Sequence, residues 1–211
     1  MTPPSTPRTA TPAILKSTSS TRASGYALIA LSAASVLLMA MHPTTGTPDF
    51  AEFVVRAGRG VPGDTLVHGS LITLIVLMAV CILSMRDALG ADRWLVRAGT
   101  ASLVVGSAGA IGAGLINGFV VPNTASHFID ACADSLSSLR PSLTLAHEAS
   151  ATLARLATVG LSMAAVAWSI CLLRLTRIPR TCGIVGLICG IAPLALHAAE
   201  RDSARARGIR G

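Results

Sequence analysis

The chain has 211 residues, of which 52% are hydrophobic and 13% charged, and its mean hydropathy is +0.64. This composition is too apolar and too poor in charge for an ordinary soluble domain, and it indicates a polytopic membrane protein. The net charge of +7 does not indicate nucleic-acid binding, because the basic residues lie between and beyond the apolar stretches without interleaved aromatics. We therefore expect the lipid bilayer, and no nucleic acid, as a partner.

The first 24 residues, MTPPSTPRTATPAILKSTSSTRAS, are rich in Pro, Thr and Ser. Such a segment cannot bury enough apolar area to order itself, so residues 1–24 are predicted to be a disordered cytoplasmic tail. Together with the apolar stretch that follows, the tail also resembles a long secretory signal with Arg8, Lys16 and Arg22 as its basic region. The stretch ends LLMAMHP without a small-x-small cleavage site, which favours an uncleaved anchor.

Five apolar stretches approach the roughly 20 residues that a membrane-spanning helix needs. They are Gly25–Met41, Leu66–Met85, Ala98–Val121, Leu143–Leu175 and Cys182–Ala199. The sequence thus predicts an all-α polytopic membrane protein, a bundle of five transmembrane helices with short loops over residues 25–199. Residues 200–211 form a basic C-terminal tail.

The basic residues predict the orientation. With a cytoplasmic N-terminus, the outer loops hold only Arg56, Arg59 and Arg140, whereas the inner segments hold Arg8, Lys16, Arg22, Arg86, Arg93, Arg97, Arg174, Arg177 and Arg180. This asymmetry follows the positive-inside rule and predicts a multi-pass protein of a bacterial-type inner (plasma) membrane. The arginines of the C-terminal tail would lie outside, so either the fifth stretch does not cross fully or the earlier loops dominate, and we favour the second explanation.

This topology brings the histidines to one side of the membrane. His42, His68, His147 and His197 lie at span ends on the outer face, with Glu148 and Glu200 beside two of them and His127 in a loop on the same side. Imidazole and carboxylate groups are common ligands of transition metals, and two facing histidines can hold haem. The histidine layer thus predicts a metal or haem binding protein, although helix-end histidines are commonly interfacial residues without a ligand.

A second hypothesis is a transporter or proton-coupled membrane component. His147, Glu148 and Arg155 would form part of a polar path, with Asn117 on the same level. Histidine suits such a path because its ordinary pKa is close to neutral pH. Alternatively, Arg155 snorkels to the outer interface, or it pairs with an acidic residue of another segment: Glu52, Asp64 or Glu200.

The third apolar stretch carries small residues at every fourth position. They are Ser102, Gly106, Ala110, Gly114 and Gly118. Such a stripe lets helices approach closely, which predicts a central helix, or a face for a homo-oligomer or another membrane partner. The alternative is a broken helix that lines a transporter cavity.

The sequence contains no catalytic motif and no catalytic triad, so an enzyme is not favoured. Cys132, alone in an outer loop, could pair between chains or join His127 as a ligand. A third hypothesis is therefore a non-catalytic membrane scaffold or assembly subunit, in which the polar residues only terminate helices.

Overall fold

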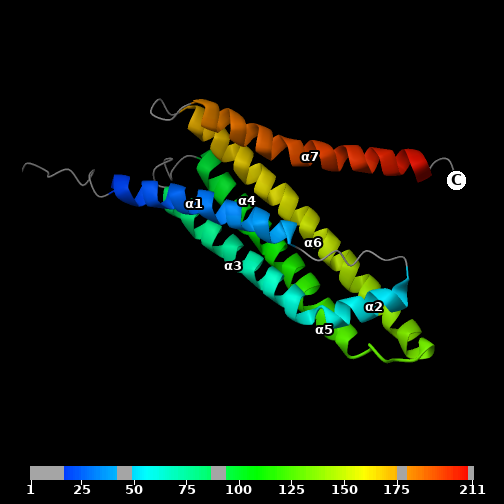
Figure 1. The fold of residues 1–211 in the computed structure, drawn as a ribbon. Helices are drawn as coiled ribbons and strands as arrows, with labels where there is room; N and C mark the ends of the chain where they lie inside the picture. The colour runs from blue at the N-terminus through cyan, green and yellow to red at the C-terminus, as the bar shows by residue number, and fades with distance from the viewer. Residues whose placement is uncertain (1–16, 42–48, 87–93, 175–179, 209–211) are drawn as a thin grey trace, which may run out of the picture.

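The computed structural model describes residues 17–41, 49–86, 94–174 and 180–208, and the side chains of residues 17–22, 197 and 200–208 lie outside that description. Throughout these ranges the regular structure is helical (Figure 1). In chain order the elements are α1 Ser17–Ala40, α2 Phe50–Arg59, α3 Val61–Met85, α4 Trp94–Leu115, the π-helical turn η3 Ile116–Val120, α5 Val121–Ser126, α6 Ala133–Leu173 and α7 Arg180–Gly208. The long helices run alternately up and down the bundle (Figure 1).

Several of these helices are long and apolar enough to cross a membrane. Within the described residues the segments are Ala23–Ala40, Val61–Met85, Trp94–Ser126 and Ala133–Leu173, with the shorter apolar segment Arg180–Leu196 in addition. The apolar helices suggest a multi-pass membrane protein, in agreement with the predicted fold class. The count of five spans is not confirmed, because the last segment falls short of the roughly 20 residues that a span needs.

The helices are longer than the apolar stretches from which they were predicted. Helix α6 begins at Ala133, ten residues before the expected Leu143, and contains Pro141. Hydropathy marks only the lipid-soluble part of a helix, whereas its polar turns stay helical when tertiary packing supports them. Here Leu139 and Leu143 are buried against Val54 of α2 and so hold the early turns of α6 in place.

Helices α4 and α6 form the most extensive helix pair. Glycines on both helices permit the close approach. A Cβ atom added at Gly160 would lie 2.7 Å from the Cα of Gly106, and one added at Gly109 would lie 2.9 Å from the backbone nitrogen of Ala157. Because lipid tails are as apolar as side chains, helices in a bilayer associate through such close van der Waals contact.

A short amphipathic helix closes one end of the bundle. Asp49 caps α2 by accepting a hydrogen bond from the Ala51 backbone N–H at 2.9 Å. Val54 and Ala57 are buried in a cluster with residues of α5 and α6, while Arg56 and Glu52 form an ion pair on the exposed side. The positions of Arg56 and Arg59 between two apolar stretches predicted a short outer loop here. It is instead a helix, lying beside α5 (Figure 1).

Helices α1 and α7 flank this arrangement. α1 packs mainly against α3, and α7 mainly against α6 (Figure 1). Large apolar side chains such as Val36 and Leu37 of α1 and Ile188 of α7 are more than half exposed. This distribution is the reverse of a soluble protein's and fits helices that face lipid.

Candidate functional site

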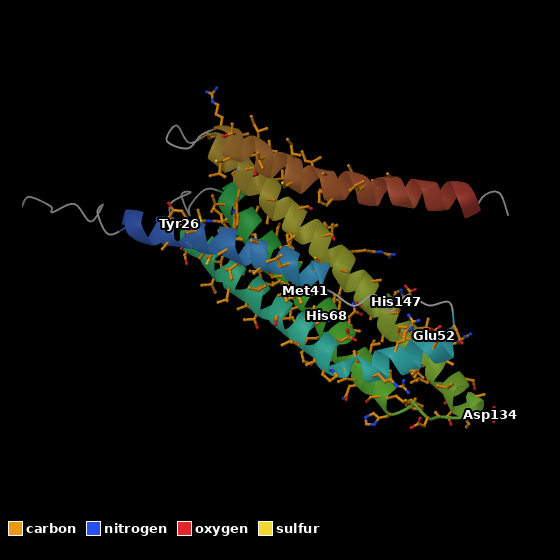
Figure 2. The ribbon with its side chains drawn as sticks, viewed as in Figure 1. Tyr26, Met41, Glu52, His68, Asp134 and His147 are labelled. Carbon is orange, nitrogen blue, oxygen red and sulfur yellow. The ribbon has the colours of Figure 1, made fainter. Side chains whose placement is uncertain are left out.

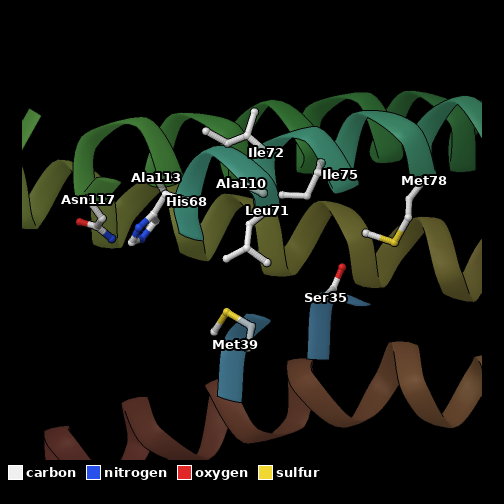
Figure 3. Close-up of a pocket in the computed structure, with 11 residues that line it drawn as sticks. Ser35, Met39, His68, Leu71, Ile72, Ile75, Met78, Ala110, Ala113 and Asn117 are labelled. Atoms are coloured by element: carbon white, nitrogen blue, oxygen red, sulfur yellow. The ribbon is translucent and has the colours of Figure 1, made fainter. Parts of the chain in front are cut away.

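A pocket with a volume of about 400 Å³ lies between α1, α3 and the α4–η3 helix (Figure 3). This volume falls within the range of roughly 300–1,000 Å³ that is typical of small-molecule sites. On α3 the lining residues begin at His68 and end at Met78, with helical spacing that places them on one face. Met39 of α1 and Ala113 of α4 contribute to the other walls.

The pocket is apolar along most of its length and polar at one end. Leu71, Ile75 and Met78 line the apolar part, and His68 and Asn117 lie together at the polar end (Figure 3). Ser35 of α1 also lines the pocket, but its hydroxyl donates to the Leu31 carbonyl at 2.9 Å within its own helix. The pocket is therefore amphipathic, with its hydrogen-bonding groups concentrated at His68 and Asn117.

His68 is buried, with 8% of its surface exposed. Its Nδ1 atom lies 3.0 Å from the backbone carbonyl oxygen of Asp64, one turn earlier in α3. A carbonyl oxygen only accepts, so Nδ1 carries a proton in this contact. The backbone of α3 itself thus orients the imidazole.

The π-helical turn η3 contains Gly118, whose backbone carbonyl is bonded by a side chain of α3. Proline has no backbone N–H, so Pro122 cannot donate to the carbonyl of Gly118, four residues earlier. The Thr65 hydroxyl of α3 donates to that carbonyl instead, at 3.1 Å. Neighbouring side chains commonly satisfy carbonyls freed by proline in membrane helices, and π-turns frequently mark functional sites.

Gly118 also determines how closely His68 approaches. A Cβ atom added at Gly118 would lie 2.6 Å from the His68 Cγ atom and even closer to its Cβ atom. Any larger residue at this position would displace the imidazole. The buried histidine and the glycine of the π-turn therefore form one structural unit, which closes the polar end of the pocket.

Only part of the predicted histidine layer belongs to the residues that the structure describes. Among the described residues, no group of three or more His, Cys, Asp or Glu side chains could hold a metal ion. His42 lies outside these residues, as do the side chains of His197 and Glu200. The predicted transition-metal or haem site is therefore not tested and stays a prediction.

The other members of the layer have different surroundings. His68 is buried beside the pocket, whereas His147 and Glu148 are exposed on α6 (Figure 2). Arg155, two turns further along α6, is exposed as well. The pocket thus unites Asn117 with His68, and neither Arg155 nor His147 lines it.

The three acidic residues that the sequence offered as partners of Arg155 lie on three different helices. Glu52 forms its ion pair with Arg56 in the next turn of α2. Asp64 is buried in the first turn of α3, and the Glu200 side chain is outside the description. For Arg155, an exposed position on α6 fits the snorkelling alternative.

The small-residue stripe does not form a single face. Positions four apart advance by about 40° around a helix, so Ser102 and Gly118 differ by roughly 160°. Gly106 packs against α6, whereas Ala110 and Gly114 line the pocket and Gly118 packs against His68 of α3. In this way α4 contacts α6 through Gly106 and α3 through the turn that carries Gly118.

Cys132 is the N-cap residue of α6 and directly precedes the apolar segment Ala133–Leu173. Its exposed Sγ atom lies 3.4 Å from the Ser135 hydroxyl oxygen, and this hydrogen bond lowers the pKa of the thiol below its ordinary value. Neither its predicted pairing between chains nor its joining His127 as a ligand is tested.

Sequence reasoning missed the pocket and the contribution of Thr65. Two signals were present. One was the i, i+3, i+4, i+7 spacing of apolar residues that follows His68, and the other was the proline four residues after Gly118. Neither signal says which neighbouring helix will face the site, because that depends on how the helices pack.

Comparison with known proteins provides no further assignment. No protein-family model, curated protein or solved structure matches the chain.

Proposed function

We propose that this chain is a membrane-embedded carrier or receptor that binds a small amphipathic molecule in the pocket between α1, α3 and α4. The observation that supports the proposal is the shape and polarity of that pocket: an apolar length of about 400 Å³ that ends at His68 and Asn117. A ligand with an apolar body and one polar end would match both parts. Among the hypotheses from the sequence, this function is nearest to the transporter.

The finer topology is part of the same proposal. We place the protein in a bacterial-type inner membrane with five spans, α7 included, and a cytoplasmic N-terminus. Arg86 and Arg174, which cap the C-terminal ends of α3 and α6, then mark the inner surface.

This placement predicts the depth of the site. His68 lies 17 residues before Met85, or roughly 26 Å along α3 at 1.5 Å per residue. Arg155 lies 18 residues before Leu173, or roughly 27 Å along α6. Since the hydrocarbon core is about 30 Å thick, both side chains reach the outer interface in helices near the membrane normal. The polar end of the pocket is thus at headgroup level, and its apolar length extends into the bilayer.

The pocket favours this function over the metal hypothesis. A metal site needs three or four converging ligands, and among the members of the predicted layer whose side chains the structure describes, His68 alone lines the pocket. The imidazole is accompanied there by a carboxamide and by apolar side chains, which suit an organic molecule better than an ion.

Photolabelling tests the binding function. The purified protein in nanodiscs is incubated with a twelve-carbon alcohol that carries a terminal diazirine, irradiated and digested for mass spectrometry. We expect saturable labelling of α1 and α3 near Met39 and Met78. The variant Ala110→Leu, which fills the pocket, should lower labelling at least tenfold, while Ala108→Leu on the exposed face of the same helix should not. Labelling that never saturates and is equal in both variants would mean annular lipid only.

Thiol accessibility tests the orientation. Cys132 precedes α6 and Cys182 lies in the first turn of α7, both exposed and at opposite ends of the bundle (Figure 1). In intact cells or spheroplasts a membrane-impermeant maleimide should modify Cys132 and should reach Cys182 only after permeabilisation. The reverse pattern would invert the proposed topology, and modification of both would contradict a sealed bundle.

A further inference from the structure

One exposed face of α6 carries three polar residues within the apolar segment Ala133–Leu173. Glu148, Thr152 and Arg155 are all exposed, and their i, i+4, i+7 spacing places them on the same side of the helix. Two exposed apolar residues, Val159 and Met163, continue this face toward the other end of α6. The order along the face is therefore apolar, cationic, hydroxyl and anionic.

The three polar side chains have no hydrogen-bond or ion-pair partner among the described residues. Thr144 and Thr158 of the same helix donate to the carbonyl four residues earlier, whereas the Thr152 hydroxyl does not. A guanidinium is always charged, and its position beside hydrocarbon is costly unless it is solvated or paired. The donors of Arg155 and Thr152 are thus available to a ligand at this face.

Arg155 lies at the level of a phospholipid headgroup. In a helix near the membrane normal it is about 27 Å from Leu173, and the hydrocarbon core is about 30 Å thick. Helical side chains lean toward the N-terminus, so the long Arg155 side chain extends toward Thr152 and the headgroups. Glu148 is about 10 Å farther out along the axis. This order holds whichever side of the membrane is outside, because the apolar turns follow Arg155 and Glu148 precedes it.

A zwitterionic headgroup has the complementary order of charges. In phosphatidylethanolamine the phosphate follows the acyl chains, and a primary ammonium lies two carbons beyond the phosphate. A guanidinium can donate two parallel hydrogen bonds to a phosphate, and a neighbouring hydroxyl can add a third. The ammonium has three N–H donors for a carboxylate. We propose that this face of α6 binds phosphatidylethanolamine, with the phosphate on Arg155 and Thr152 and the ammonium on Glu148.

Other occupants complement the face less well. The quaternary ammonium of phosphatidylcholine has no N–H to donate, and phosphatidylglycerol offers no cation to the Glu148 carboxylate. A second copy of the chain, packed through the same face about a two-fold axis along the membrane normal, would bring Arg155 against its own counterpart. None of the three polar residues lines the pocket, so a lipid here is independent of the ligand proposed there.

Native mass spectrometry of the purified protein tests the lipid. The protein is mixed with equal amounts of phosphatidylethanolamine, phosphatidylcholine and phosphatidylglycerol that have the same acyl chains. We expect the unmodified protein to retain phosphatidylethanolamine about threefold or more over either of the others, as one charge-assisted hydrogen bond at an exposed site implies. Arg155→Gln should remove most of the retained lipid. Glu148→Gln should lower phosphatidylethanolamine only to the level of phosphatidylcholine.

Matched controls remove the same charges elsewhere. Arg59→Gln on α2 and Asp130→Asn in the turn before α6 change exposed residues away from this face and should keep the preference. Ala110→Leu, which fills the pocket, should keep it as well. A loss of the preference in Ala110→Leu would place the lipid in the pocket and overturn its assignment to α6.

Two further results would also overturn the proposal. One is retention of either other lipid by the unmodified protein at or above the level of phosphatidylethanolamine. The other is a preference that Glu148→Gln leaves unchanged. The comparison of lipids needs no variant, so the folding of Arg155→Gln does not decide the result. Saturable labelling of the pocket tests the proposed function separately, and each of the two can fail while the other stands.

Discussion

Replacement of Gly118 by alanine tests whether the π-turn holds His68 in place. The new Cβ atom would lie 2.6 Å from the His68 Cγ atom, whereas ordinary contacts are at 3.4–4 Å, so one of the two must move by at least about 0.8 Å. Overpacking of this kind costs typically 1–3 kcal/mol. The shift also strains the hydrogen bond from Thr65 to the Gly118 carbonyl, which contributes about 1 kcal/mol.

A control on the same helix isolates this effect. A Cβ atom at Gly114 would lie 3.3 Å from the Cγ1 atom of the Ile72 side chain, a contact that a few tenths of an ångström relieve. Both substitutions bring a similar gain in helix propensity, which cancels in the comparison. We therefore expect Gly118→Ala to lower the free energy of unfolding by about 2–4 kcal/mol more than Gly114→Ala.

Titration with SDS in mixed micelles measures this difference, and labelling with the diazirine alcohol measures the site. Gly118→Ala should weaken saturable labelling, because the displaced imidazole no longer closes the polar end of the pocket. Equal unfolding free energies in the two variants, together with unchanged labelling, would refute the argument that the glycine positions His68.

Three further substitutions test separate parts of the structure. Thr65→Val should lower the free energy of unfolding by about 1 kcal/mol through loss of the hydroxyl donor, and Thr65→Ser should retain it, as SDS titration would show. Gly160→Ala places a Cβ atom 2.7 Å from the backbone of α4 and should destabilise by about 3 kcal/mol or more, whereas Gly63→Ala, with nothing within 4 Å, should not; similar values for the two would contradict the close helix contact. Because a hydrogen bond from Ser135 lowers the pKa of Cys132, more of its thiol is ionised at a given pH below that pKa. In Ser135→Ala the pKa should rise, and the rate of maleimide modification at pH 7 should fall and recover at higher pH; an unchanged pH profile would exclude this role of the hydroxyl.

The apolar helices could be predicted from the sequence because hydropathy reports solubility in lipid directly. The stretch Leu66–Met85 ends at the same residue as α3, whose helix starts at Val61. The polar extensions could not be predicted in this way. The early turns of α6 and the whole of α2 depend on the burial of Val54, Ala57 and a few leucines against one another. Such contacts follow from tertiary packing, to which a hydropathy window is blind.

The two polar residues of the candidate pocket were each named from the sequence, but not as a pair. His68 and Asn117 were both candidate residues, the first as a metal ligand and the second as part of a polar path with Arg155. The structure joins them to each other, because the helices carrying them pack side by side while Arg155 is exposed on α6. The sequence gives the order of residues along each helix, whereas the rotation of neighbouring helices about their axes determines which side chains come into contact. The π-turn adds a local change of register that a regular 3.6-residue repeat does not anticipate.

A single proline links these features. Pro122 deprives the Gly118 carbonyl of its helical donor, Thr65 of α3 supplies a replacement, and the glycine then allows His68 to pack against the turn. A leucine at the histidine's place would be cheaper to bury, and a filled pocket would be more stable than an open one. Under the proposed binding function, a ligand with an apolar body fills the space and so offsets the cost of leaving the pocket open. That proposal accounts for the irregular turn, the buried histidine and the adjoining pocket together.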